Sequence, residues 1–165
     1  PTPPTPHRCS RSGSDVRAVV QRVRRASVHV DGLETGAIGH GLLVLLGVAR
    51  EDTPADAEYV IKKILHGRYF DGPEGRPMDR SVAEVGGGIL VVSQFTLYGD
   101  VRRGKRPAFD QAAPADLARA TYEDVVRQLR AVHQPVATGE FQAMMQVELV
   151  NDGPITILID SLRHF

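Results

Sequence analysis

Eight consecutive residues, 41–48, carry no polar side chain. A strand with one face in water alternates apolar and polar residues, so an unbroken apolar run of this length predicts a strand buried on both faces. Such a strand needs a layer of structure on each side of its sheet. Because 165 residues are enough for one core, we expect a single domain built in layers.

Other segments supply the remaining strands and two helices. Thr53 and Pro54 fit the N-cap and first position of a helix, and a second helix is predicted from Pro114. Asp31-Gly32 favours a tight hairpin turn. Further strands are predicted at 16–23, 26–30, 33–38, 68–70, 89–92, 135–138, 146–150 and 154–159. This pattern predicts an α/β fold of mixed, mainly antiparallel strands with two helices packed on one side.

The first fifteen residues contain four prolines and three serines without hydrophobic periodicity. They predict a disordered tail at 1–15, followed by a folded domain at 16–165. Twenty basic and twenty acidic residues cancel, so contact with nucleic acid would need a local patch. Cys9 is the single cysteine and no apolar run approaches 18 residues, so we expect a soluble cytosolic protein without a membrane partner.

Two short polar segments beside apolar runs are candidates for a binding or catalytic site. Residues 93–98 close the run 89–92, and residues 151–156 lie between two further apolar runs. At a strand end, backbone N–H and C=O groups leave the ladder and become available to a ligand. Taken alone, the first segment also fits a capped strand end and the second a simple turn, so both interpretations stay open.

Other catalytic signatures are weak. Residues 99–105 nearly match a P-loop, but Arg106 replaces the required Ser or Thr, and Pro107 blocks the helix that must follow. Residues 36–41 have glycines in the wrong order for a dinucleotide fingerprint and favour a turn between strands. The histidines show no ligand spacing, so we expect no metal and no cofactor. A triad built on Ser93 stays open, although the glycines of a nucleophile elbow are missing.

Five segments in order, at 17–23, 41–48, 93–98, 111–114 and 151–156, resemble the D-aminoacyl-tRNA deacylases, also called D-tyrosyl-tRNA deacylases. The resemblance implies a three-layer α/β/β fold and a homodimer that hydrolyses D-aminoacyl-tRNA without a cofactor. Members of this family usually begin with Met-Arg-Ala where this chain has Val16-Arg17-Ala18, which suggests that Val16 is the true start.

The resemblance also assigns roles to the segment after residue 92. Ser93 and Gln94 would orient the substrate, and the backbone N–H groups of Phe95 and Thr96 would stabilise the oxyanion of the ester. The 2′-hydroxyl of the substrate ranks ahead of Thr96 as a reacting group. Phe95 and Phe141 are candidate stacking surfaces for the terminal adenine, with core packing as the alternative for each.

The second segment would test chirality. In the resembled family, Gly153 and Pro154 of one subunit enter the partner's pocket and exclude L-amino acids, supported here by Arg22, Asn151 and Thr156. Rejection of this kind needs two carbonyls pointing the same way, so we predict a cis Gly153-Pro154 bond. A trans bond would favour a relative that clears L-alanine from mischarged tRNA.

A cluster of cations after the first segment is predicted to contact RNA phosphates: Arg102, Arg103, Lys105 and Arg106. Gln142 and Met144 stand where the family commonly has Gly and a polar residue, which puts the pocket's shape in question. A non-catalytic tRNA-binding module is the competing function. D-Tyr, D-Phe, D-Asp and glycine, the last on tRNA specific for alanine, are not ranked as substrates by the sequence.

Overall fold

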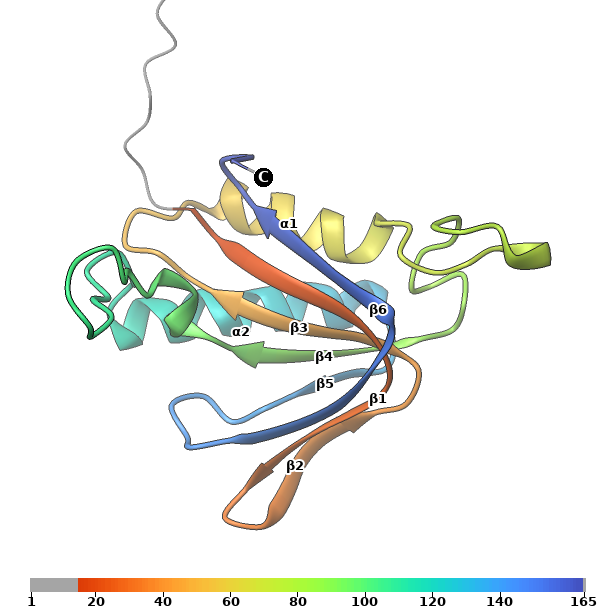
Figure 1. The fold of residues 1–165 in the computed structure, drawn as a ribbon, viewed down its shortest axis with the longest axis horizontal. Coiled ribbons are helices and arrows are strands. Elements are labelled where there is room, and N and C mark those ends of the chain that lie inside the picture. Colours follow the sequence, from red (N-terminus) through yellow and green to blue (C-terminus); the bar gives the residue numbers. More distant parts are fainter. Residues whose placement is uncertain (1–14, 165) are drawn as a thin grey trace, which may run out of the picture.

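The computed structural model describes residues 15–164, which form one six-stranded sheet and two α-helices (Figure 1). The helices are α1 (Pro54–His66) and α2 (Ala115–Val132), with two short 3₁₀ helices, η1 (Pro73–Gly75) and η2 (Phe95–Tyr98). The strands are β1 (Arg17–Val30), β2 (Leu33–Ile38), β3 (Gly41–Gly47), β4 (Gly88–Ser93), β5 (Val136–Thr138) and β6 (Gln146–Asp160).

The sheet is mixed, as predicted. Its strand order is β2-β1-β3-β4-β5, and β6 pairs along β1. Strand β1 is antiparallel to β2, β3 and β6, whereas β3, β4 and β5 run parallel to one another. Most of the predicted tail lies outside the described residues, but Asp15, its last residue, is buried.

Strand β3 is buried on both faces, as its unbroken apolar run predicted. Leu42, Val44 and Leu46 belong to a core that also contains the apolar faces of α1 and α2. Leu43 belongs to a second core on the opposite face. Alternate side chains of a strand point to opposite faces, so β3 is the middle of three layers.

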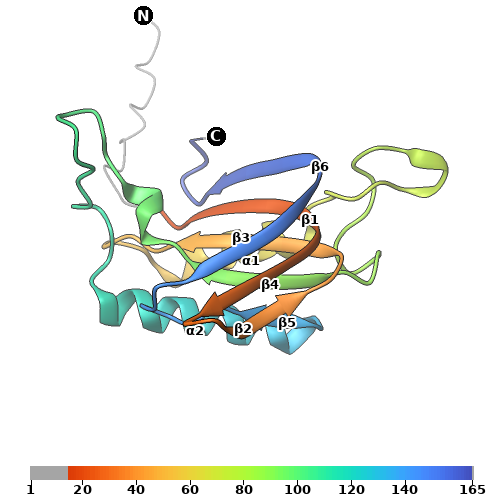
Figure 2. The ribbon, with the colours of Figure 1, turned by 60° about the horizontal axis from the view of Figure 1, so that its bottom comes forward.

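The third layer comes from the long strands β1 and β6. They run side by side and bend over the sheet. The second half of β1 and the first half of β6 thereby cover the face opposite the helices (Figures 1 and 2). Val23 and Val28 of β1 and Val147 and Leu149 of β6 pack in this second core. The fold is therefore α/β/β, with both helices on one side, which confirms the predicted fold class.

Both predicted helices are present. Thr53 is the N-cap of α1, and its N–H donates to the Asp56 carboxylate (2.8 Å). Pro114 is the N-cap of α2, so this helix begins one residue later than predicted. No helix among residues 15–164 has the length and hydropathy needed to cross a membrane.

The strand boundaries differ from prediction at three places. The segments 16–23 and 26–30 form one strand because irregularities in its ladder with β6 let β1 bend without ending. The segments 146–150 and 154–159 likewise join in β6. The predicted strand at 68–70 is wrong: Phe70 forms only an isolated bridge with Arg80, and its apolar character reflects burial of its ring.

Candidate functional site

A cavity of about 560 Å³ opens at the carboxyl end of β4. Four of the predicted site residues, Ser93, Gln94, Phe95 and Phe141, meet there although the last is distant in sequence. None of the lining side chains is ionisable, so the cavity can hold a ligand by shape and dipoles but not by charge. It is lined by Val92, Ser93, Gln94, Phe95, Ala113, Ala115, Ala118, Phe141, Gln142, Ala143, Met144, Met145 and Val147.

The backbone turns sharply where β4 meets the cavity. The N–H of Gln94 donates to the Leu46 carbonyl (2.8 Å), which extends the β3–β4 ladder, and η2 begins at the next residue. The first N–H groups of a helix have no acceptor within it, so those of Phe95 and Thr96 have no partner inside η2. The side-chain amide of Gln94 donates to the Thr96 hydroxyl, which is exposed and does not line the cavity.

The short helix η2 is held from beneath by the start of β1. Arg17 Nη1 donates to the Leu97 carbonyl (3.1 Å), and its guanidinium lies 5.0 Å from the centre of the Tyr98 ring. Tyr98 is buried, and its hydroxyl donates to the Asp15 carbonyl. These contacts fix the backbone that carries Phe95 and Thr96.

The two predicted stacking residues differ in burial. Phe95 is 55% exposed, and its ring forms an edge-type contact with the Phe109 ring, with ring centres 5.1 Å apart. Phe141 packs against the main core beside Tyr122, with ring centres 5.8 Å apart. The exposed ring at the cavity is therefore Phe95, while Phe141 serves as both core and cavity wall.

The second polar segment forms a wide bulge in the β1–β6 ladder. Val23 pairs with Asn151 and Gln21 pairs with Thr156, so Arg22 alone stands opposite residues 152–155. The Asn151 side chain replaces the missing ladder contacts: its Oδ1 accepts from the Ile155 N–H (2.8 Å), and its Nδ2 donates to the Ile155 carbonyl (3.1 Å). The Gly153-Pro154 bond is cis, which confirms that prediction.

Arg22 fills the space opposite this bulge. Its Nε donates to the Asp152 carbonyl (2.9 Å) and its Nη1 to the Tyr69 carbonyl (3.0 Å). The Asp71 carboxylate lies 3.4 Å from the same Nη1. Arg22 is only 8% exposed, so these acceptors take the place of water around a buried guanidinium.

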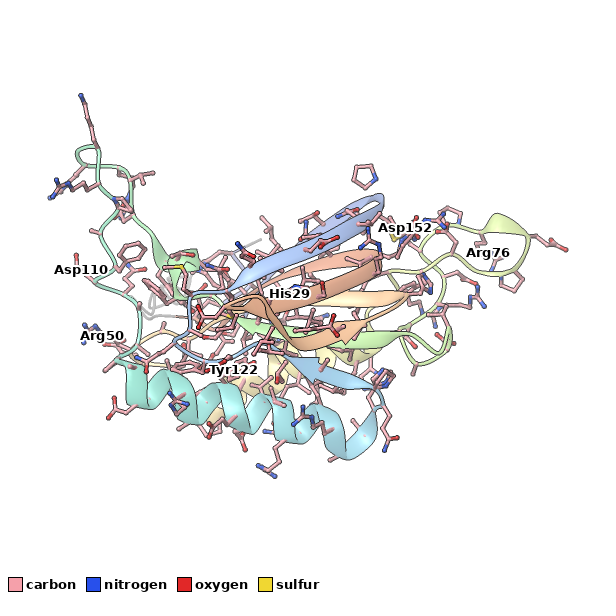
Figure 3. The ribbon with its side chains drawn as sticks, turned by 90° about the horizontal axis from the view of Figure 1, so that it is seen from below. His29, Arg50, Arg76, Asp110, Tyr122 and Asp152 are labelled. Carbon is pink, nitrogen blue, oxygen red and sulfur yellow. The ribbon has the colours of Figure 1, made fainter. Side chains whose placement is uncertain are left out.

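The bulge and the cavity lie far apart on one chain. Asp152 lies beside the loop that carries Arg76, whereas Asp110 and Arg50, near the start of α2, lie at the opposite end (Figure 3). The cavity includes Ala115 and Ala118 of the first turn of α2. Gly153 and Pro154, both exposed, are therefore remote from the cavity of their own chain.

The sequence model of the D-Tyr-tRNA(Tyr) deacylase family matches residues 19–160, which include the cavity segment, Arg22 and the bulge. The chain belongs to this family. Its membership confirms the resemblance seen in the sequence.

Two relatives match over their whole length. The chain is 57% identical over 150 residues to the D-aminoacyl-tRNA deacylase of Koribacter versatilis and 59% identical over 150 residues to that of Anaeromyxobacter dehalogenans. Each alignment covers 91% of this chain and all of the relative.

Solved structures share the fold. The c-Myc DNA Unwinding Element Binding Protein superposes with a TM-score of 0.83 at 44% identity, covering 87% of this chain and 97% of that one. A probable eukaryotic D-amino acid tRNA deacylase superposes with a TM-score of 0.73 at 19% identity, covering 88% and 99%. At that lower identity the second structure supports the fold alone.

The segments that resemble a P-loop, a dinucleotide fingerprint and a Ser93 triad lack the local structure that these motifs need. The loop 99–106 leads into no helix, and residues 36–41 join β2 to β3. In the described part of the chain, no histidine lines the cavity that holds Ser93.

The predicted cationic patch lies on the loop that follows η2. Arg102 is bound by the Asp100 carboxylate, with Nη2 2.6 Å and Nε 2.9 Å from its oxygens. This pairing lowers the pKa of Asp100 to about 2. Arg103, Lys105 and Arg106 are exposed and form no ion pair with any of residues 15–164. Three of the four cations are therefore free to bind an anion.

A buried charged cluster beneath η2 was missed by sequence reasoning. Asp15 and Asp160 are both buried, with Arg17 3.1 Å from the first and His164 3.1 Å from the second. Burial raises the pKa of Asp15. Ligand atoms of Asp15, Asp160 and His164 lie within 4.8 Å of one another, close enough to hold a cation, but each carboxylate already has a basic neighbour. The cluster joins the two ends of the domain, so no local pattern could reveal it.

Asp52, close to this cluster, makes the stability of the protein depend on pH. Burial raises its pKa to about 7, although its Oδ2 accepts the Ala49 N–H (2.5 Å). The folded state therefore binds the carboxyl proton of Asp52 more tightly than the unfolded state does. The stability that this proton adds to the fold is lost as the pH rises from about 4 to 7. Asp52→Asn keeps the acceptor and removes the charge.

We expect Asp52→Asn to be more stable than the parent protein at pH 8 by about 2 kcal/mol, a value reduced for partial exposure of the carboxyl group. The difference should nearly vanish at pH 4. Urea unfolding of both proteins at the two pH values measures it. A stability difference that does not change with pH would show that Asp52 titrates normally.

Proposed function

We propose that the protein is a D-aminoacyl-tRNA deacylase acting at the cavity beside β4. Water would attack the ester carbonyl that links the amino acid to the terminal ribose, and the ribose oxygen would leave with a proton to give free amino acid and tRNA. The observation that carries this proposal is a cavity without ionisable lining side chains at the junction of β4 and η2, in a chain that belongs to the deacylase family.

The residues present suit a reaction driven by position and dipoles. The N–H groups of Phe95 and Thr96 would donate to the oxyanion, because preorganised donors stabilise charge that develops in the transition state. Gln94, held by Thr96, would keep this turn in place. The position of the Thr96 hydroxyl outside the cavity lining supports the 2′-hydroxyl of the substrate as the group that assists the reaction.

The exposed ring of Phe95 would stack on the terminal adenine, with Phe141 forming the opposite wall. Both rings line the cavity that would receive the ester. The amino acid would then project toward Met144 and Met145, where no charged side chain selects among amino acids.

Stereochemical selection would need a second copy of the chain. Gly153 and Pro154 are remote from their own cavity, so the pair would act in the cavity of a partner and exclude L side chains, as the family resemblance implies. Among residues 15–164, strand β6 pairs only with β1, so its outer edge has no strand partner, and Leu158 on this strand is 53% exposed. An open edge with an exposed apolar side chain supports a homodimer.

An assay of purified protein on D-aminoacyl-, L-aminoacyl- and glycyl-tRNA tests the proposal. We expect hydrolysis of the D-substrate that persists in a chelator, resistance of the L-substrate, and a dimer by light scattering. The glycyl substrate, charged on tRNA specific for alanine, shows whether an achiral amino acid is accepted. A monomer with full stereospecificity would rule out the cross-subunit arrangement.

Binding without hydrolysis would instead favour a nucleic-acid-binding module. One relative of known structure is named for DNA binding, which makes this the second candidate. The same assay separates the two, because a binding module retains labelled tRNA on a filter while leaving its ester intact.

Replacing Arg103, Lys105 and Arg106 with Ala is expected to weaken tRNA binding and reduce its salt dependence. Each lost phosphate contact lowers the log–log slope by about 0.7–0.9. The slope is obtained by measuring tRNA affinity at salt concentrations from about 50 to 200 mM, over which phosphate contacts change the affinity strongly. Lys62→Ala on α1 is the control, because Lys62 is already paired with Glu58. An equal slope in both variants would show that the three loop cations do not contact phosphates.

A further inference from the structure

Within residues 15–164, the turn at residues 69–71 provides the hydrogen-bond and ion-pair partners of the Arg22 guanidinium that lie outside β1 and β6. It provides two acceptors, the Tyr69 carbonyl at 3.0 Å and the Asp71 carboxylate at 3.4 Å, both to Nη1. A guanidinium is a flat fork with fixed donor directions, so acceptors on Nη1 set the direction in which Nε points. Here Nε points at the Asp152 carbonyl, directly before Gly153.

This turn is itself rigidly anchored. Phe70 is 2% exposed, and its ring packs edge-on against His40 with centres 5.1 Å apart. Its backbone pairs with Arg80 in both directions, N–H to carbonyl at 3.1 Å and 2.9 Å. Arg80 Nε also donates to the Asp71 carbonyl (2.7 Å). The backbone that carries both acceptors is therefore held in place by contacts that do not involve Arg22.

The bulge, in contrast, has little support of its own. Residues 152–155 have no ladder partners in β1, and only the Asn151 side chain bridges across them. Asp152 is held on two sides, its carbonyl by Arg22 and its carboxylate between Arg22 (3.7 Å) and Arg24 (3.6 Å). The link to the anchored turn runs through the Arg22 side chain.

We propose that the turn at 69–71 is a positioning element for the Gly153-Pro154 loop, and that Asp71 is a positioning residue that acts through Arg22. This inference rests on the proposed function, because the loop matters for stereochemistry only if the protein deacylates D-aminoacyl-tRNA. Asp71 touches neither the cavity nor Gly153, so its effect would reach the substrate by fixing a loop.

Asp71→Ala tests the proposal without endangering the fold, because this side chain is 50% exposed. We expect the ratio of L- to D-aminoacyl-tRNA hydrolysis to rise by about fivefold, the effect of losing one partly exposed ion pair, with the D-rate retained. Asp71→Asn keeps an acceptor but not the charge, so its L-to-D ratio should lie between those of the parent protein and Asp71→Ala. Glu74→Ala, at the tip of the same loop and without contact to Arg22, should match the parent protein.

A second measurement does not depend on activity. The Ile155 N–H donates to Asn151 across the bulge, so its hydrogen exchange reports how well the loop is held. We expect it to exchange about fivefold faster in Asp71→Ala than in Glu74→Ala. Equal exchange and an unchanged stereochemical ratio would overturn the positioning role, whereas a parent protein without D-aminoacyl-tRNA hydrolysis would overturn the proposed function and leave the exchange result to decide on Asp71.

Discussion

Gly41→Ala is expected to prevent stable folding. Gly41 pairs with Gly88 at the start of the ladder between two inner strands, and a Cβ atom on Gly41 would lie 2.0 Å from the Gly88 carbonyl oxygen and 2.7 Å from its nitrogen. Backbone atoms of a central ladder cannot move aside as a flexible side chain can, so β3 and β4 would have to separate. Overpacking of this kind costs about 3 kcal/mol or more, a large part of the stability of a domain of this size.

Gly39→Ala is the matched control. It lies two residues earlier, in the turn between β2 and β3, and a Cβ there would meet no heavy atom within 4 Å. We expect its urea midpoint to stay close to that of the parent protein, while Gly41→Ala shows a greatly lowered midpoint or no cooperative transition. Similar midpoints for both variants would show that the close approach of β3 and β4 is not as described.

The contrast between these glycines marks a limit of sequence reasoning. The apolar run 41–48 predicted a strand buried on both faces, because burial is encoded by side-chain pattern. Why the run begins with glycine depends on which strand lies beside it and in what register. That register is a tertiary property, and no spacing within residues 41–48 contains it.

The candidate site also contains some residues that the sequence predicted and others that it could not. The segment 93–98 was predicted because a strand end and its polar residues are neighbours in the chain. Its residues 93–95 line the cavity, while their role in catalysis stays a prediction. Two partners of Arg22 outside the bulge were not predicted: Tyr69 lies in a segment interpreted as a strand, and Asp71 directly follows that segment. Every residue type has a backbone carbonyl, so no sequence pattern could have identified Tyr69 as a partner of Arg22.

The sequence identified the bulge segment by its residue types but not by its structure. Asn151, Gly153 and Pro154 are turn residues, and the sequence alone favoured a turn between two strands. The structure continues β6 through them, since β1 remains paired on both sides of the bulge. A bulge in a long strand and a turn between two strands use the same residue types, and only the pairing of β1 distinguishes them.

Arg22→Ala is expected to lower both stability and stereospecificity. The Asp152 and Tyr69 carbonyls would each lose a donor in a partly buried site, which costs about 2–4 kcal/mol in total. If Gly153 and Pro154 exclude L-amino acids as proposed, the released loop should also allow hydrolysis of L-aminoacyl-tRNA to rise by about tenfold relative to the D-substrate, the effect of losing about 1.4 kcal/mol of discrimination.

Arg25→Ala separates this effect from a general loss of charge. Arg25 lies on the same strand and pairs with Glu148 at 2.9 Å, but both side chains are more than half exposed, so its loss should cost less than about 1 kcal/mol. Arg22→Lys keeps the charge without the fork and should fall between the two. Unfolding curves and parallel assays of D- and L-substrates measure both properties. If Arg22→Ala loses stability but keeps its stereospecificity, Arg22 supports the fold and the exclusion of L-amino acids must come from other groups.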